Sequence, residues 1–196
     1  MMKDLERLVF EQVDHVYKLD NFIIPSVTQI INPILKVVYE NINLQTLMAK
    51  AHLGSKVHKL VERYVKFKFA QPDDITQDYF NNFLAFWNEL NANHKVEIIS
   101  TEFKGFYEDK EMVFGGTIDI VLKVDNEVWL IDWKTVSKPI KLMLALQMYG
   151  YKKIVNFLGI EVNKVKAVQL TKKGYEMLDL TDEVESKKIE NMFKVL

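Results

Sequence analysis

The chain has 196 residues, 48% of them hydrophobic and 27% charged, with a formal net charge of −1. This length suits one domain with a sizeable core, and no apolar run approaches the roughly 18–20 residues that a membrane helix needs. Because the sequence lacks cysteine, disulfides, thiolate metal sites and iron–sulfur clusters are excluded, and oxygen or imidazole groups remain as metal ligands.

Residues 1–95 predict a mainly helical part. A helix is expected over 3–19, and its charged, amphipathic start lacks the layout of a secretory signal, so we expect a cytoplasmic protein. A short helix should follow Ser26, whose hydroxyl precedes an apolar run and can cap it. Longer helices are predicted over 44–69 and 73–91. The aromatic side chains of the last helix recur at helical spacing and indicate core (Phe80, Phe83, Phe86 and Trp87).

Residues 96–180 have the pattern of a sheet interrupted by one helix. Runs rich in Val, Ile, Phe and Trp predict strands over 96–107, 111–124, 127–135, 165–171 and 175–180. A helix is expected over 138–158, and a capped helix from Thr181 over 181–196. This order indicates a single α/β or α+β domain with a central mixed sheet.

The stretch 115–135 contains a predicted hairpin that joins two carboxylates. If Asp125-Asn126 is a two-residue loop, Val124 faces Glu127 and Asp119 falls opposite Asp132. Side chains alternate along a strand, so Lys134 shares the face of Asp132. Two carboxylates about 4.5–5.5 Å apart at Cβ repel each other unless something compensates, and a divalent cation is the simplest compensator.

The opposite face of this hairpin is predicted to be core. It carries Ile118, Ile120 and Leu122 against Trp129, Ile131 and Trp133. An alternative is a hairpin shifted by one residue, which would make the two aspartates unrelated surface groups. The apolar neighbours on the aspartate face favour a covered face instead (Val121, Val128 and Leu130).

The sequence G-T-I-D at 116–119, followed by I-D-W-K-T at 131–135, resembles the core motif of PD-(D/E)xK nucleases, in particular the RecB-like branch. That branch has an upstream histidine, an acidic residue on the preceding strand and a Q-x-x-x-Y helix, which this chain matches with His58, Glu102, Gln147 and Tyr151. The stretches 24–30 and 130–139 are similar to those of mitochondrial genome-maintenance exonucleases and their phage relatives. The resemblance covers roughly residues 24–155.

The resemblance implies a restriction-endonuclease-like core and a metal-dependent catalytic centre. Asp119 and Asp132 would bind Mg²⁺ or Mn²⁺, with His58 and the backbone carbonyl of Trp133 as further ligands. The cation would polarise the phosphate and acidify a water molecule. Lys134 would position that water or stabilise the charge of the transition state.

Further residues are predicted to act around this centre. Glu102 and Glu62 would orient the ligands, and Gln147 with Tyr151 would contact DNA by hydrogen bonding and stacking, although Tyr151 could instead be core. Ser26 and Thr28 could contact a phosphate, but helix capping is an equal alternative. The basic residues of the 44–69 helix could steer a nucleic-acid backbone or form a solvated face (Lys56, Lys59, Arg63, Lys66 and Lys68).

The expected function is hydrolysis of DNA, as an exonuclease on single strands or free ends in replication, recombination or repair. The resemblance also implies a phage origin, a host cytoplasm and recruitment by a replication or recombination protein. The alternatives are a structure-specific flap endonuclease, a nucleic-acid-binding module that does not cleave, and a small-molecule metalloenzyme that uses the same carboxylates.

Overall fold

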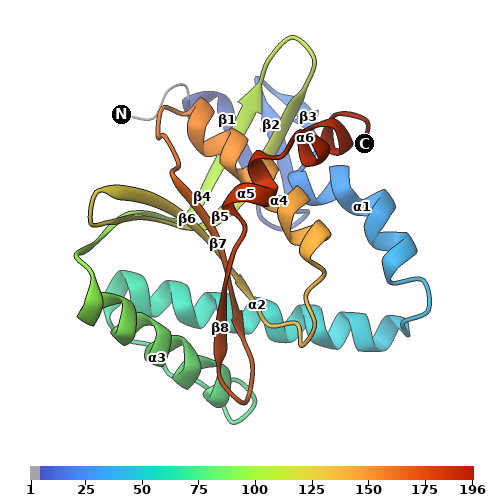
Figure 1. Cartoon of the computed structure of the whole chain (residues 1–196). Helices are drawn as coiled ribbons and strands as arrows, with labels where there is room; N and C mark the ends of the chain where they lie inside the picture. Colours follow the sequence, from blue (N-terminus) through green and yellow to red (C-terminus); the bar gives the residue numbers. More distant parts are fainter. Residues whose placement is uncertain (1–4) are drawn as a thin grey trace.

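The structure is a computed structural model that describes residues 5–196 as two sheets and six α-helices (Figure 1). None of the helices in this part of the chain combines the length and apolar character needed to cross a membrane. The elements in chain order are η1 (Leu5–Arg7), β1 (Leu8–Glu11), β2 (Val16–Leu19), β3 (Phe22–Ile24), α1 (Val27–Val38), α2 (Leu44–Phe67), α3 (Gln77–Asn93), β4 (Val96–Glu108), β5 (Val113–Val124), β6 (Glu127–Lys134), α4 (Lys141–Phe157), β7 (Lys164–Leu170), β8 (Tyr175–Asp179), α5 (Thr181–Glu185) and α6 (Lys187–Lys194).

The five-stranded sheet has the order β4-β5-β6-β7-β8, and the predicted mixed sheet is confirmed. Its strands pair antiparallel except β6 and β7, which pair parallel. Parallel neighbours need a crossover connection, and α4 supplies it between β6 and β7. The helix therefore passes close to the end of β6, where the predicted aspartate and lysine lie.

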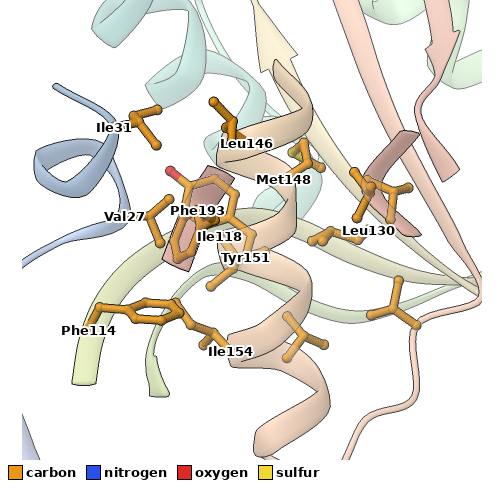
Figure 2. Packing of buried hydrophobic residues seen from close by; sticks show 14 of the residues in the cluster. Val27, Ile31, Phe114, Ile118, Leu130, Leu146, Met148, Tyr151, Ile154 and Phe193 are labelled. Carbon is orange, nitrogen blue, oxygen red and sulfur yellow. The ribbon is translucent and has the colours of Figure 1, made fainter. Parts of the chain in front are cut away.

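Helices cover both faces of this sheet. On one face α2 and α3 pack against β5, β6 and β7, and the core between them includes Phe83 of α3 with Ile131 and Trp133 of β6. On the other face α4 packs with α1, α5 and α6, and Figure 2 shows Tyr151 at the centre of this cluster. Apolar side chains on both sides of a strand make it a buried element, so the polar groups inside it need a specific role.

The predicted helix over 3–19 is wrong for the residues that the structure describes, and residues 3 and 4 lie outside them. This segment forms β1 and β2, which continue into β3 as an antiparallel sheet. Burial alternates along β2, where Tyr17 and Leu19 are buried. Asp20 and Asn21 both have positive φ (49° and 70°), as a two-residue hairpin turn between β2 and β3 requires.

Three smaller expectations also change. The helix after Ser26 is longer than expected, because α1 continues through Pro33 to Val38. The C-terminal helix is two helices, since the backbone of Ser186 is extended and its hydroxyl caps α6. Ile118 packs in the α4 cluster, not with Ile120 as predicted. Strict alternation fails beyond Ile120, where the pairing of β5 with β6 ends.

Gly150 sets the contact between α4, α1 and α6, and its replacement should destabilise the fold. A Cβ at this position would lie 2.7 Å from a methyl group of Val27 and 3.1 Å from the ring of Phe193. We expect Gly150→Val to lower the free energy of unfolding by about 1–3 kcal/mol, because overpacking forces buried neighbours apart. Urea unfolding followed by circular dichroism measures this change. Gly174→Val is the control, since no atom lies within 4 Å of a Cβ there; equal losses in both variants would contradict the packing account.

Candidate metal centre

The hairpin of β5 and β6 has the register predicted from Asp125-Asn126. Val124 pairs with Glu127, and the paired positions continue to Ile120 with Ile131. The next position in this register joins Asp119 and Asp132, where the ladder ends. At this point Asp119 Oδ2 accepts a hydrogen bond of 2.8 Å from the backbone N–H of Trp133. The side chain of Asp119 thus replaces the backbone hydrogen bonding between β5 and β6 at this position.

His58 reaches this point from α2 and joins the two strands. Its Nε2 lies 2.9 Å from the carbonyl oxygen of Trp133, and its Nδ1 lies 3.2 Å from Asp119 Oδ1. A ring that donates through Nε2 is held in one orientation, which directs Nδ1 toward the carboxylate. The Trp133 carbonyl, predicted as a metal ligand, is therefore also the group that orients the histidine.

Glu102 joins His58 and Asp119 in one cluster. One ligand atom from each of these three residues lies within 4.8 Å of the other two. Glu102 follows Thr101 in β4, which pairs with Ile120, so it faces the Asp119 position. Its φ of 48° is left-handed, a conformation that costs about 1–3 kcal/mol for a residue with a side chain and persists only where the surroundings impose it. The predicted orienting residue thus lies among the potential ligands.

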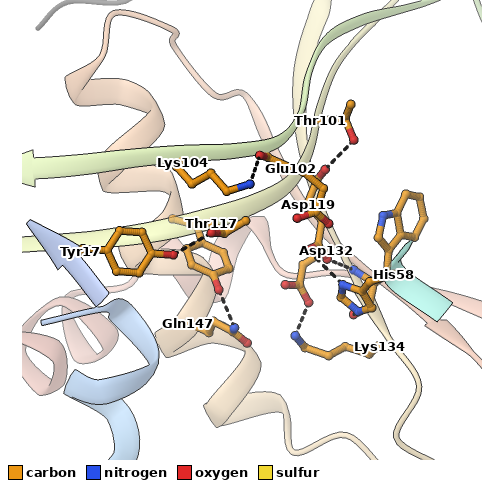
Figure 3. Close-up of polar contacts among 12 residues, drawn as sticks. Tyr17, His58, Thr101, Glu102, Lys104, Thr117, Asp119, Asp132, Lys134 and Gln147 are labelled. Atoms are coloured by element: carbon orange, nitrogen blue, oxygen red, sulfur yellow. Dashed lines mark hydrogen bonds and ion pairs between the residues drawn. The ribbon is translucent and has the colours of Figure 1, made fainter. Parts of the chain in front are cut away.

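Asp132 and Lys134 lie beside this cluster rather than within it. Both project from β6 on the same face, as predicted, and Lys134 Nζ forms an ion pair with Asp132 Oδ2. Apart from this ion pair, Asp132 Oδ2 is buried and has no hydrogen-bond partner. Figure 3 shows the aspartates, His58 and Lys134 converging on one region, with Glu102 above them. A buried carboxylate oxygen whose one partner is a lysine still has lone pairs for a further ligand.

The cluster strongly perturbs the ionisation of its members. Burial lowers the pKa of His58, but the charges of Asp119 and Asp132 outweigh it and raise this pKa to about 9. Burial and the charge of Asp119 raise the pKa of Glu102 to about 7. Burial opposes the ionisation of Asp119, yet His58 and Lys134 hold its pKa below the usual range. For Asp132 burial dominates over Lys134, and its pKa is raised.

Gln147 and Tyr151 are adjacent on α4, as predicted. The Gln147 side-chain amide donates a hydrogen bond of 2.8 Å to the Tyr151 hydroxyl. Burial, followed by the charges of Asp132 and Asp119, raises the pKa of Tyr151 well above its usual range, so the hydroxyl keeps its proton. Tyr151 is only 7% exposed. The ring is not available for stacking on a base, and hydrogen bonding remains as the contact that this pair can make.

Three other predicted residues do not join the cluster. Ser26 forms a capping box with Gln29, so the alternative of helix capping accounts for it. Thr28 is exposed on α1. Glu62 lies one turn after His58 on α2 and forms a salt bridge of 2.5 Å with Lys66. Its side chain is therefore engaged with a cation and does not orient His58.

Tyr17 is a neighbour of the centre that sequence reasoning missed. Its hydroxyl lies 2.6 Å from the hydroxyl of Thr117 on β5. Burial raises the pKa of Tyr17, with a smaller contribution from the charge of Glu102. The predicted helix over 3–19 includes Tyr17. The alternation of buried and less buried residues in β2 is the signal that could have placed it on a strand.

The donor set fits a hard divalent cation. Carboxylate oxygens suit Mg²⁺ and Mn²⁺, and an imidazole nitrogen among them is compatible with Mn²⁺ in particular. A bound cation would offset the buried negative charge of the two aspartates and displace the protons that His58 and Glu102 retain because their pKa values are raised. These residues could hold a cation, with Lys134 and the protonated hydroxyl of Tyr151 near it.

Comparison with known proteins assigns no family. No family model matches the sequence, and no curated protein matches it. A solved structure described as "Crystal structure of SSO0001" aligns with a TM-score of 0.39 and 16% identity over 72% of this chain and 71% of that chain. A likeness at this level carries no argument about function, and the resemblance to PD-(D/E)xK nucleases stays a prediction.

Proposed function

We propose that the chain is a divalent-metal-dependent nuclease that hydrolyses phosphodiester bonds of DNA, preferably in single strands or at free ends. The observation that carries the proposal is the meeting of His58, Glu102 and Asp119 within 4.8 Å, next to the ion pair of Lys134 with Asp132. Potential metal ligands with a lysine beside them are groups that metal-dependent hydrolysis of a phosphodiester can use.

Each residue of the site has a distinct task in this proposal. His58, Glu102 and Asp119 would hold the cation, which when bound polarises the phosphate and lowers the pKa of a water molecule. Asp132 would complete the ligand set through the oxygen that now contacts only Lys134. Lys134 would stabilise the negative charge that develops on the phosphate.

The Tyr151 hydroxyl adds a neutral donor at the same place. Its pKa is raised well above the usual range, so it remains protonated at neutral pH and can donate a hydrogen bond to a phosphate oxygen. Gln147 fixes the position of this hydroxyl through their 2.8 Å hydrogen bond. Catalysis would therefore combine a fixed cation site with donors from both β6 and α4.

Digestion of labelled DNA tests the activity. We expect wild type with Mn²⁺ or Mg²⁺, but not with EDTA, to degrade end-labelled linear single-stranded DNA, because hydrolysis requires the cation. Lys134→Ala should reduce the rate by about 10²–10³-fold, as loss of one charge-stabilising donor does. Lys172→Ala, at an exposed position between β7 and β8, is the control and should retain full activity.

Circular single-stranded DNA in the same assay separates the alternatives. A requirement for ends leaves circles intact and supports an exonuclease. Cutting of circles supports an endonuclease. Binding without cutting of either substrate would overturn the proposal in favour of a module that only binds nucleic acid.

Cation binding can be measured without any substrate. We expect Mn²⁺ to raise the melting temperature of wild type, since a ligand at about 100 times its Kd stabilises the fold by roughly 2.7 kcal/mol. Glu102→Gln should lose most of this increase because it removes a ligand charge. Glu176→Gln, an exposed carboxylate on β8, should behave as wild type. Equal Mn²⁺ shifts in all three proteins would show that the cation binds elsewhere.

The affinity for Mn²⁺ should increase with pH. The pKa values of His58 and Glu102 are raised to about 9 and about 7, so without a cation both groups retain protons near neutral pH. A cation must displace these protons, and its Kd should fall as the pH rises from about 6 to about 9. Titration calorimetry in two buffers of different ionisation enthalpy measures the protons released. A Kd independent of pH, with no proton release, would contradict this assignment of the ligands.

A further inference from the structure

A hollow of about 500 Å³ lies against the outer face of α2. Three of its lining residues are cations at helical spacing, Lys56, Lys59 and Arg63, and the segment between α2 and α3 forms the other wall with Gln71 and Asp73. Residues three, four and seven apart share one helix face, so the three cations line one side of the hollow together.

The charge of this hollow is positive after its internal pairs are counted. Lys56 forms a salt bridge of 2.8 Å with Asp73, and the other lining carboxylate, Glu62, is paired with Lys66 at 2.5 Å. Lys59 and Arg63 are exposed and form no salt bridge within residues 5–196. Two cations are thus left to meet an anion from solution.

Two exposed aromatic side chains follow these cations along the chain. Phe67 ends α2 and is 73% exposed, and Phe69 follows it at 70%. Lys68, between them in sequence, has its amine 5.4 Å from the centre of the Trp87 ring. Exposed aromatic rings next to cations form the kind of surface on which bases stack while the backbone phosphates are neutralised.

This surface lies on the same helix as His58 but on another face, since Lys59, Arg63 and Phe67 are about 100°, 140° and 180° around α2 from His58 at about 100° per residue. Glu62 lines the hollow and follows His58 by four residues on α2. From His58 to Phe67 the helix rises roughly 14 Å at about 1.5 Å per residue. That rise alone equals about four phosphate spacings of roughly 3.4 Å, and a strand that extends from the metal centre to Phe67 must also pass around the helix.

We propose that the C-terminal half of α2 is a docking track for single-stranded DNA, in which Lys59 and Arg63 neutralise backbone phosphates and Phe67 and Phe69 stack on bases beyond the cleavage point. The proposal rests on the proposed nuclease function only in identifying the docked strand as the substrate. The whole chain has a net charge of −1 and so does not attract a polyanion by its overall charge. The two cations without salt bridges provide a local attraction on this part of α2 instead.

The stacking part is tested by binding in EDTA, where no cation-dependent cleavage can occur. The probe is fluorescein-labelled oligothymidylate of about 12 nucleotides, within the site sizes of about 4–16 nucleotides typical of single-strand grooves. We expect the double variant Phe67→Ala/Phe69→Ala to raise Kd, measured by fluorescence anisotropy, by about tenfold or more. Phe22→Ala, which removes a ring that is 77% exposed on β3, is the matched control and should leave Kd unchanged.

The electrostatic part is tested by salt dependence. Each phosphate contact on a single strand contributes about 0.7 to the slope of log K against log salt concentration. The double variant Lys59→Gln/Arg63→Gln should therefore lower the magnitude of this slope by about 1.4, whereas Lys110→Gln, at an exposed position between β4 and β5, should not change it. Far-ultraviolet circular dichroism verifies that every variant is folded.

The outcomes separate this inference from the proposed function. Oligonucleotide binding that neither α2 double variant weakens would overturn the docking track, even if wild type cleaves DNA. Binding that both variants weaken, in a protein that cleaves nothing, would support the track and overturn the nuclease.

Discussion

The hydrogen bond from the Trp133 N–H to Asp119 Oδ2 determines how the rest of the site is built. Regular pairing of β5 and β6 ends at Ile120 and Ile131, and this bond keeps the two strands together one position further. It uses one oxygen of Asp119, leaves the other for His58, and presents the Trp133 carbonyl to the same histidine. A buried carboxylate is stable only with such partners, so the ligands are prepared by the strands themselves.

Much of this centre could be predicted from the sequence because it depends on a two-residue periodicity. The loop Asp125-Asn126 set the register, and the register placed Asp119 near Asp132 and Lys134 on the same face. Periodicity could not place Glu102 among the ligands, because its left-handed φ departs from strand geometry. The predicted position of Ile118, on the same face as Ile120, was wrong for a similar reason, because side chains alternate only while the strand remains regular.

The N-terminal segment shows the opposite case. Its apolar residues were interpreted with the period of a helix, whereas the segment forms strands with a period of two. Residues 3–19 have charged and apolar positions that fit a helix as well as two short strands, and strands of four residues give little periodicity to count. The dipeptide Asp20-Asn21 is the same as the one that defines the hairpin at 125–126. Used in the same way, it would have predicted the turn before β3 and placed Tyr17 on a strand.

The centre is assembled from parts of the chain that are far apart in sequence. The two contacts of His58 join residues separated by 61 and 75 positions. Closing such long loops is entropically costly, so we expect these contacts to form only when α2 packs on the β5–β6 hairpin. Amide hydrogen exchange at Trp133 should consequently report global unfolding rather than local fraying, and a chain still emerging from the ribosome would lack a formed cation site until residue 134 has left the exit tunnel.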